Sequence, residues 1–149
     1  MRKRGFAHCL IILILFSQTA ATFSDIEFIR DDLGFTLGKA RKENKDIMIF
    51  FYTDWCAWCK AMDRHIFADK KVAEFLKNLV TIRINAEKGD GPTFVRRFKV
   101  DSYPTVVFLD SWGKEINRIN GFLPPAYFLE VSQNIINNNR SHQSRTPRR

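Results

Sequence analysis

The sequence predicts an α/β fold in which a central mixed β-sheet is flanked by helices on both faces. Apolar runs of strand length alternate along the chain with segments whose apolar residues recur at helical spacing. The run 47–52 is continuously apolar, which is typical of a strand buried on both faces. A turn at 111–114 joins two late strands as a hairpin, which adds an antiparallel pair to the sheet.

Each predicted element follows from a local signal. Asp31 and Asp32 offer a cap for the first helix, because their carboxylates can accept from its free N–H groups. Pro92 suits the first turn of a short helix, and Pro124 and Pro125 open the last one. We expect strands at 26–29, 47–52, 79–84, 104–109 and 115–120, and helices from the Asp31–Asp32 cap to about 44, over 56–67 and 72–76, around 94–98, and from 124 to about 136.

Length and charge limit the possible classes of protein. The 149 residues suffice for one domain with a proper core, which we assign to residues 22–139. Of the formal net charge of +8, three charges lie in residues 1–21 and four in residues 140–149, which leaves one for the segment between them. We therefore expect a nearly neutral domain without a nucleic-acid partner, followed by a disordered basic tail at 140–149.

The first 21 residues have the pattern of a secretory signal peptide. Arg2-Lys3-Arg4 precedes an apolar segment from Cys9 to Phe16, and Thr19-Ala20-Ala21 offers a cleavage site. The apolar segment is about half of the roughly 20 residues that a membrane-spanning helix needs. We therefore expect an exported protein, which is periplasmic in a Gram-negative bacterium and secreted or extracytoplasmic otherwise.

The most informative motif is Cys56-Ala57-Trp58-Cys59, which follows the buried strand and opens a helix. Positive potential at a helix start favours the thiolate, the attacking species in disulfide exchange. The pattern predicts an exposed, acidified sulfur at Cys56. It also places Cys59 close enough to displace a substrate that Cys56 has bound in a mixed disulfide. A structural staple is the alternative, but so short a ring constrains the unfolded chain little.

Metal chemistry is a weaker interpretation of the same two cysteines. A zinc site needs two further ligands, and the exported chain offers only His65, which is predicted on the opposite side of the helix, and His142 in the tail. Haem attachment needs a histidine directly after the second cysteine, but this sequence has Lys60 there. We predict no metal and no cofactor. Copper delivery by the thiol pair remains an alternative, because soft thiolates suit Cu(I).

Taken together, Trp55-Cys56-Ala57-Trp58-Cys59-Lys60 and Ser102-Tyr103-Pro104-Thr105 resemble the thioredoxin superfamily. The likeness covers nearly all of residues 25–137. It is closest to exported thioredoxin-like proteins related to the C-terminal domain of the bacterial transmembrane disulfide reductase. The resemblance implies a thioredoxin fold and a thiol–disulfide oxidoreductase.

By that resemblance, Cys56 attacks and Cys59 resolves, while Pro104 is a cis-proline packed against the disulfide. The Tyr103 backbone is then available to pair with an extended substrate. Trp55 and Trp58 offer substrates an apolar surface; core packing is the alternative role for both.

The chain departs from the family at one position. Classical thioredoxins carry a buried aspartate six residues before the first cysteine, where this sequence has Phe50. The proton acceptor for Cys59 is therefore left open. Arg83 stands in the third strand, where thioredoxins often have a lysine.

Ala57 and Trp58 add no charge between the cysteines, which favours a reductase or isomerase over a disulfide oxidase or folding catalyst. The expected partners are disulfide-containing exported proteins and a membrane-embedded electron donor, and the protein is expected to be a monomer. A thioredoxin-like binding module without turnover is the alternative from another class.

Overall fold

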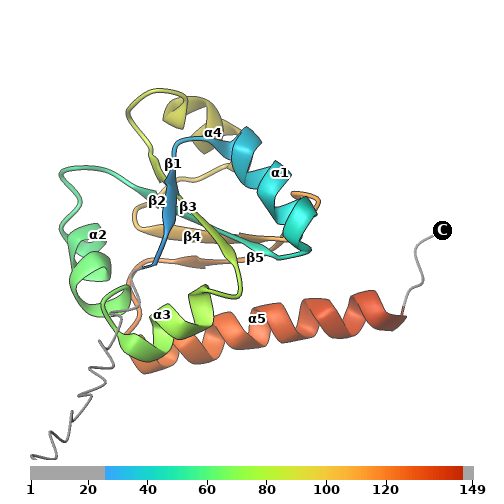
Figure 1. The fold of residues 1–149 in the computed structure, drawn as a ribbon. Helices are drawn as coiled ribbons and strands as arrows, with labels where there is room; N and C mark the ends of the chain where they lie inside the picture. Colours follow the sequence, from blue (N-terminus) through green and yellow to red (C-terminus); the bar gives the residue numbers. More distant parts are fainter. Residues whose placement is uncertain (1–25, 146–149) are drawn as a thin grey trace, which may run out of the picture.

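The computed structural model describes residues 26–145, and side chains up to residue 143. Figure 1 shows this part of the chain as a layered arrangement of helices and strands. The predicted signal peptide and residues 146–149 of the predicted tail lie outside the described residues. None of the helices within 26–145 is long and apolar enough to cross a membrane.

A five-stranded mixed sheet forms the centre of the domain. Its strands lie in the order β1-β3-β2-β4-β5, with β1, β3 and β2 parallel and with β4 and β5 antiparallel to their neighbours. The mixed sheet is therefore confirmed. The strands are β1 (Phe28–Arg30), β2 (Ile47–Tyr52), β3 (Val80–Asn85), β4 (Thr105–Leu109) and β5 (Glu115–Asn120).

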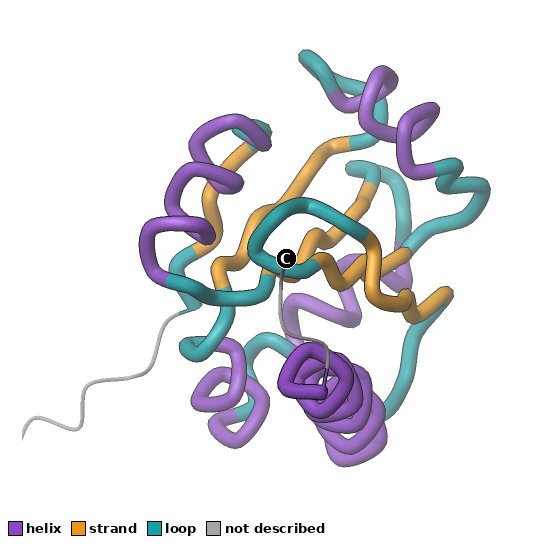
Figure 2. Tube along the Cα trace, turned by 90° about the vertical axis from the view of Figure 1, so that its right-hand side faces the viewer, coloured by secondary structure: helices purple, strands orange, loops and turns teal. Residues whose placement is uncertain are grey.

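Helices cover both faces of the sheet, as predicted, and each face has its own hydrophobic core. Residues of α1 and α4 pack on one face, and residues of α2, η1, α3 and α5 pack on the other. Figure 2 shows the helices on either side of the strands. The helices are α1 (Leu33–Glu43), α2 (Ala57–Ala61), the π-helical turn η1 (Met62–Ile66), α3 (Lys70–Leu76), α4 (Gly91–Phe98) and α5 (Pro125–Arg145).

The cap of α1 fits the sequence prediction. Asp32 accepts a hydrogen bond from the Phe35 N–H at 2.8 Å and so begins α1, which ends where Asn44 adopts a left-handed conformation. Asp69 likewise caps α3 by accepting from two backbone N–H groups. α1 thus begins where the sequence indicated, whereas the Asp69 cap, which the sequence analysis did not identify, starts α3 at Lys70, before the predicted residue 72.

The last helix is longer than predicted. It continues to Arg145, so residues 140–145, which the sequence assigned to a disordered tail, are helical. The reason is tertiary: Asp46, which is buried immediately before β2, accepts from the Asn139 amide at 3.5 Å and pairs with Arg140 at 3.6 Å. These contacts hold a polar segment that has no apolar periodicity of its own.

Candidate active site

The two cysteines lie at the carboxyl end of β2, the strand between β3 and β4. Open α/β sheets commonly place their chemistry at this edge. The chain leaves the sheet after Tyr52 and reaches Cys56, whose N–H donates to the Thr53 carbonyl at 3.3 Å. Cys56 then caps α2, because its sulfur accepts a hydrogen bond from the Cys59 N–H at 3.0 Å. The short link 53–55 thus fixes the sulfur of Cys56 at the start of the helix.

Cys56 and Cys59 form a disulfide, with an S–S distance of 2.09 Å and a Cα–Cα distance of 5.2 Å. Both belong to the hydrophobic core beneath α2, and Cys56 is only 4% exposed. The prediction of an exposed sulfur at Cys56 is therefore wrong for the oxidised pair. The flanking tryptophans, rather than the sulfurs, occupy the solvent-facing positions.

Trp55 and Trp58 are 66% and 62% exposed, which rules out core packing as their role. Trp58 packs its ring against Phe122 at a centroid distance of 5.4 Å. Sequence analysis missed Phe122, which lies in the loop after β5; its apolar character beside Gly121 was the only signal. One exposed tryptophan thus precedes the disulfide in the chain, and the other lies between its two cysteines.

The second motif meets the first through an aromatic contact. The Tyr103–Pro104 peptide bond is cis, which confirms the expected cis bond. Tyr103 packs against the core cluster that contains both cysteines, and its ring meets Trp55 edge to face at 6.3 Å. Burial raises the pKa of the Tyr103 hydroxyl, with a smaller contribution from Glu87. Residues about 45 positions apart in the chain therefore form one surface.

A polar network that the sequence did not reveal ties the segment before Cys56 to the loop after β3. The Trp55 indole donates to Glu87 at 2.9 Å. Asp54 accepts from the Asn85 amide at 3.0 Å and pairs with Lys88 at 2.6 Å. The Lys88 hydrogen bond holds the pKa of Asp54 below its ordinary value. No motif marks these residues, because only the fold brings the two loops together.

Beneath the pair, the position of the family's aspartate is filled by the fully buried Phe50. Its register partner on β3 is Arg83, whose guanidinium lies 4.5 Å from the ring centre of Tyr52 and 5.6 Å from that of Phe50. Arg83 also pairs with Asp63 of η1 at 3.2 Å. Arg83, paired with Asp63, thus lies beside the position that the family's aspartate occupies.

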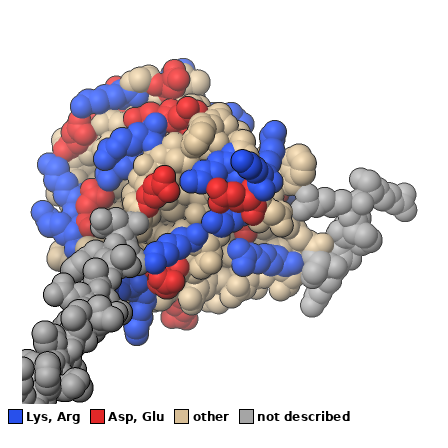
Figure 3. All heavy atoms as spheres, in the orientation of Figure 1, with Lys and Arg blue, Asp and Glu red and all other residues tan. Residues whose placement is uncertain are grey.

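Other surfaces of the described residues offer less chemistry. Within 26–145, no group of three or more His, Cys, Asp or Glu side chains is placed to hold a metal ion. Figure 3 shows Lys and Arg interspersed with Asp and Glu on one face, without a single basic patch. That distribution fits the expectation of a domain with little net charge.

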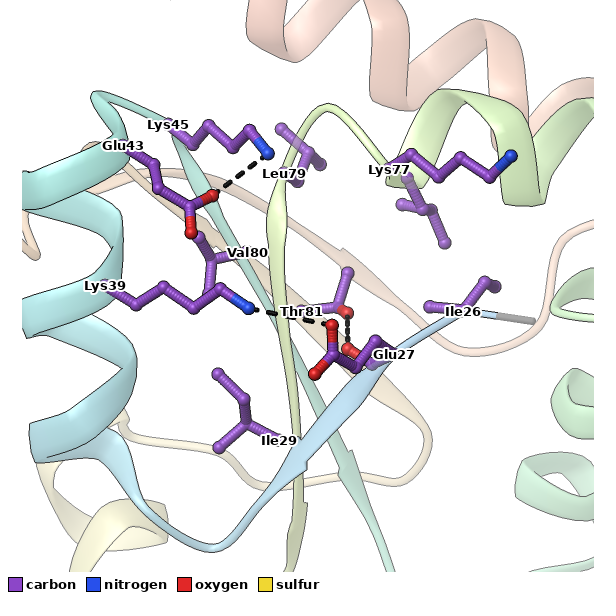
Figure 4. A pocket seen from close by; sticks show the side chains of 11 residues that line it. Ile26, Glu27, Ile29, Lys39, Glu43, Lys45, Lys77, Leu79, Val80 and Thr81 are labelled. Carbon is purple, nitrogen blue, oxygen red and sulfur yellow. Dashed lines mark hydrogen bonds and ion pairs between the residues drawn. The ribbon is translucent and has the colours of Figure 1, made fainter. Parts of the chain in front are cut away.

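A cavity of about 200 Å³ opens between α1, β1 and the start of β3. Figure 4 shows its ion pairs: Lys39 with Glu27 at 3.7 Å and Lys45 with Glu43 at 3.0 Å. The Lys45 hydrogen bond lowers the pKa of Glu43. These charges already have partners on the chain itself, and the cavity lining includes neither cysteine.

The arrangement around the cysteines suits disulfide exchange. A reduced pair supplies two electrons, and the Cys59 N–H points at the sulfur that would carry the thiolate. The exposed aromatic side chains beside it offer contact area to a polypeptide.

Comparison with known proteins supports this assignment. The family described as thioredoxin-like domain matches residues 35–136. The thiol:disulfide interchange protein DsbD of Yersinia pestis is 35% identical over 99 residues, which are 64% of this chain and 17% of that protein. DsbD of Vibrio vulnificus (strain YJ016) is 33% identical over 129 residues, 81% of this chain and 21% of that protein. The chain thus spans about a fifth of the length of these relatives.

Two solved structures share the fold. A DsbH oxidoreductase superposes with a TM-score of 0.68 at 20% identity, covering 80% of this chain and 92% of that one. A thioredoxin from Thermus thermophilus gives a TM-score of 0.66 at 24% identity, covering 73% of this chain and 87% of that one. At these identities the likeness concerns the fold.

Proposed function

The chain belongs to the thioredoxin-like domain family, and from this we propose that it is a thiol–disulfide oxidoreductase that reduces or isomerises disulfides in exported proteins. The resemblance stated from the sequence is thereby confirmed at the level of the family. The chain is related to the DsbD proteins over part of its length. The reaction, its substrates and the roles of the site residues belong to the proposal.

One observation carries the proposal most strongly. Cys56 and Cys59 are joined at the start of α2, where the Cys59 N–H donates to the Cys56 sulfur at 3.0 Å. A hydrogen bond donated to a thiolate favours that charged form and so lowers the pKa of the thiol. The same N–H therefore supports a thiolate at Cys56 once the pair is reduced. A binding module without turnover has no need of this arrangement.

The reaction begins with the reduced protein. The Cys56 thiolate attacks one sulfur of the substrate disulfide, forms a mixed disulfide and releases the other substrate sulfur as a thiolate, which takes up a proton. Cys59 then loses its proton and attacks the Cys56 sulfur, which releases the second substrate thiol. Two electrons have passed to the substrate, and the Cys56–Cys59 disulfide is restored.

Substrate contact is assigned to the surface beside the pair. Trp55 and Trp58 present exposed rings, and the cis Tyr103–Pro104 segment lies next to Trp55. We assign the Tyr103 backbone to pairing with an extended substrate segment, as the sequence resemblance implied. A folding polypeptide with a non-native disulfide offers such an extended segment.

A reductase in an oxidising compartment must be reduced again after each turnover. We assign this step to a membrane-embedded dithiol donor and the protein to the periplasm. The charged and apolar pattern of residues 1–21 supports export. We treat the protein as a monomer.

Insulin reduction and a glutathione redox titration test the proposal. The wild-type protein should reduce insulin, Cys56→Ser should be inactive, and Cys59→Ser should accumulate mixed disulfides because the resolving thiol is gone. The reduction potential should lie nearer the −270 mV of thioredoxin than the −120 mV of the strongest periplasmic oxidant. Equal activity of all three proteins contradicts the mechanism, and tight Cu(I) binding without insulin reduction favours copper delivery.

A further inference from the structure

Trp55 is both exposed and held in place, a combination that calls for an explanation. Two-thirds of its surface faces solvent, so burial of the ring does not fix its orientation. Its indole N–H instead donates to the Glu87 carboxylate at 2.9 Å, and its ring edge meets Tyr103 at 6.3 Å. The orientation of this ring thus depends on a residue 32 positions away in the chain.

Glu87 is itself anchored. Its backbone N–H donates to the side-chain oxygen of Asn85 at 3.0 Å, and Asn85 is 3% exposed. The same Asn85 side chain donates to Asp54, the residue before Trp55. The backbone N–H of Asn85 donates to Asp31 at 3.0 Å. One buried amide therefore sets the positions of both Glu87 and the segment that carries Trp55.

We propose that Glu87 is a positioning residue for substrate binding: it holds the Trp55 indole beside the cis Tyr103–Pro104 segment, ready to receive an apolar side chain next to the substrate cysteine. This inference rests on the proposed oxidoreductase function. Binding that must first order a side chain is weaker than binding to a side chain already ordered. Glu87 therefore acts on the affinity for polypeptides, whereas the exchange chemistry stays with the cysteines.

Loss of the Glu87 hydrogen bond should affect polypeptide substrates and small disulfides differently. An extended polypeptide reaches Trp55 when its disulfide meets Cys56, because the two residues are adjacent in the chain. A small aromatic disulfide such as 5,5′-dithiobis(2-nitrobenzoate) has no flanking polypeptide to place there. Loss of the hydrogen bond should therefore raise the KM for insulin and leave kcat and the rate with the small disulfide nearly unchanged.

Two substitutions distinguish the hydrogen bond from the charge. Glu87→Ala removes the acceptor, whereas Glu87→Gln removes the charge and keeps a side-chain oxygen that accepts from the indole. Glu74→Ala is the matched control, since Glu74 is an exposed carboxylate of α3 that pairs with Lys77 at 2.8 Å. The readouts are steady-state kinetics with both substrates, and hydrogen exchange of the Trp55 indole N–H followed by NMR.

We expect Glu87→Ala to raise the KM for insulin about fivefold, a loss of roughly 1 kcal/mol in binding, and to speed exchange of the Trp55 indole N–H. Glu87→Gln and Glu74→Ala should stay within about twofold of wild type. An unchanged KM in Glu87→Ala, unchanged exchange, or equal losses in Glu87→Ala and Glu87→Gln overturns the proposal. A wild-type protein that reduces neither substrate contradicts the proposed function instead, and the exchange measurement still tests the hydrogen bond.

Discussion

The backbone N–H of Cys59 donates a hydrogen bond to the sulfur of Cys56 at 3.0 Å, so the second cysteine of the pair supports the first through its main chain as well as through its thiol. The sulfur occupies the place that a serine or aspartate oxygen takes at an ordinary helix start. Once the disulfide is reduced, this donor faces a sulfur that can carry charge. Capping and activation are then two effects of one contact.

The pair formed by Trp58 and Phe122 should contribute to polypeptide binding. An aromatic contact between this pair and a substrate side chain is worth about 0.5–1.5 kcal/mol beyond its buried area. Trp58→Ala or Phe122→Ala should therefore raise the KM for insulin about 2–10-fold. The reduction potential should not move, because neither ring carries charge. Trp112→Ala is the matched control, as Trp112 is 59% exposed in the β4–β5 turn. Equal KM values in all three variants and the wild type would refute this role.

Asp63 should stabilise the fold through Arg83. The Arg83 side chain is 16% exposed and the Asp63 side chain 41%, so solvent screens the pair only in part. Asp63→Ala leaves a largely buried guanidinium without its carboxylate, and we expect a loss of about 1–3 kcal/mol in the free energy of unfolding by urea. Arg83→Met should cost less, because Phe28, Phe50 and Tyr52 surround that site with apolar surface. A greater loss for Arg83→Met would contradict this account.

Two glycines should respond in opposite directions to the same substitution. A Cβ at Gly91 would lie 1.8 Å from the Asn85 carbonyl oxygen, whereas a Cβ at Gly38 would meet nothing within 4 Å. Gly91→Ala should therefore destabilise the protein by more than about 2 kcal/mol. Gly38→Ala lies inside α1 and should stabilise it by about 0.5–1 kcal/mol. Urea unfolding of both variants decides the matter, and a Gly91→Ala protein as stable as wild type refutes the close approach.

Asp46 should make stability depend on pH. Burial raises the pKa of this carboxyl, while Arg140 acts in the opposite direction. Between the unfolded pKa of about 3.9 and the higher folded value, the native state holds more protons than the unfolded chain. Stability should therefore fall as pH rises through that window.

Asp46→Asn should flatten this part of the stability profile, and Arg140→Gln should extend the fall to higher pH because it removes the opposing charge. Urea midpoints measured from about pH 3 to pH 7 provide the test. Superimposable profiles for the three proteins would contradict the assignment to Asp46.

The strands and most helix starts could be predicted because their signals are local. The apolar run of β2, the carboxylate cap at Asp32 and the proline at the start of α4 each act within a few residues. The extension of α5 could not be predicted, because a distant carboxylate at Asp46 holds its polar turns.

The candidate site likewise combines residues that local motifs predict with residues that only the fold brings together. Both cysteines and the cis-proline segment belong to contiguous motifs, so the sequence reveals them. Phe122 and Glu87 enter through contacts with Trp58 and Trp55 that only the folded chain creates. The burial of the Cys56 sulfur was also missed, because it depends on packing beneath α2 rather than on the motif.

The pKa of the Cys56 thiol in the reduced protein tests the central claim most directly. Alkylation by iodoacetamide, followed over pH with the modified cysteine identified by mass spectrometry, should show Cys56 reacting with a midpoint well below the 8.5 or so of an ordinary thiol. Cys59 should react more slowly, because its backbone N–H donates to the Cys56 sulfur and so favours the thiolate at Cys56. A midpoint at 8.5 or above, or a Cys56 that does not react, would contradict the account.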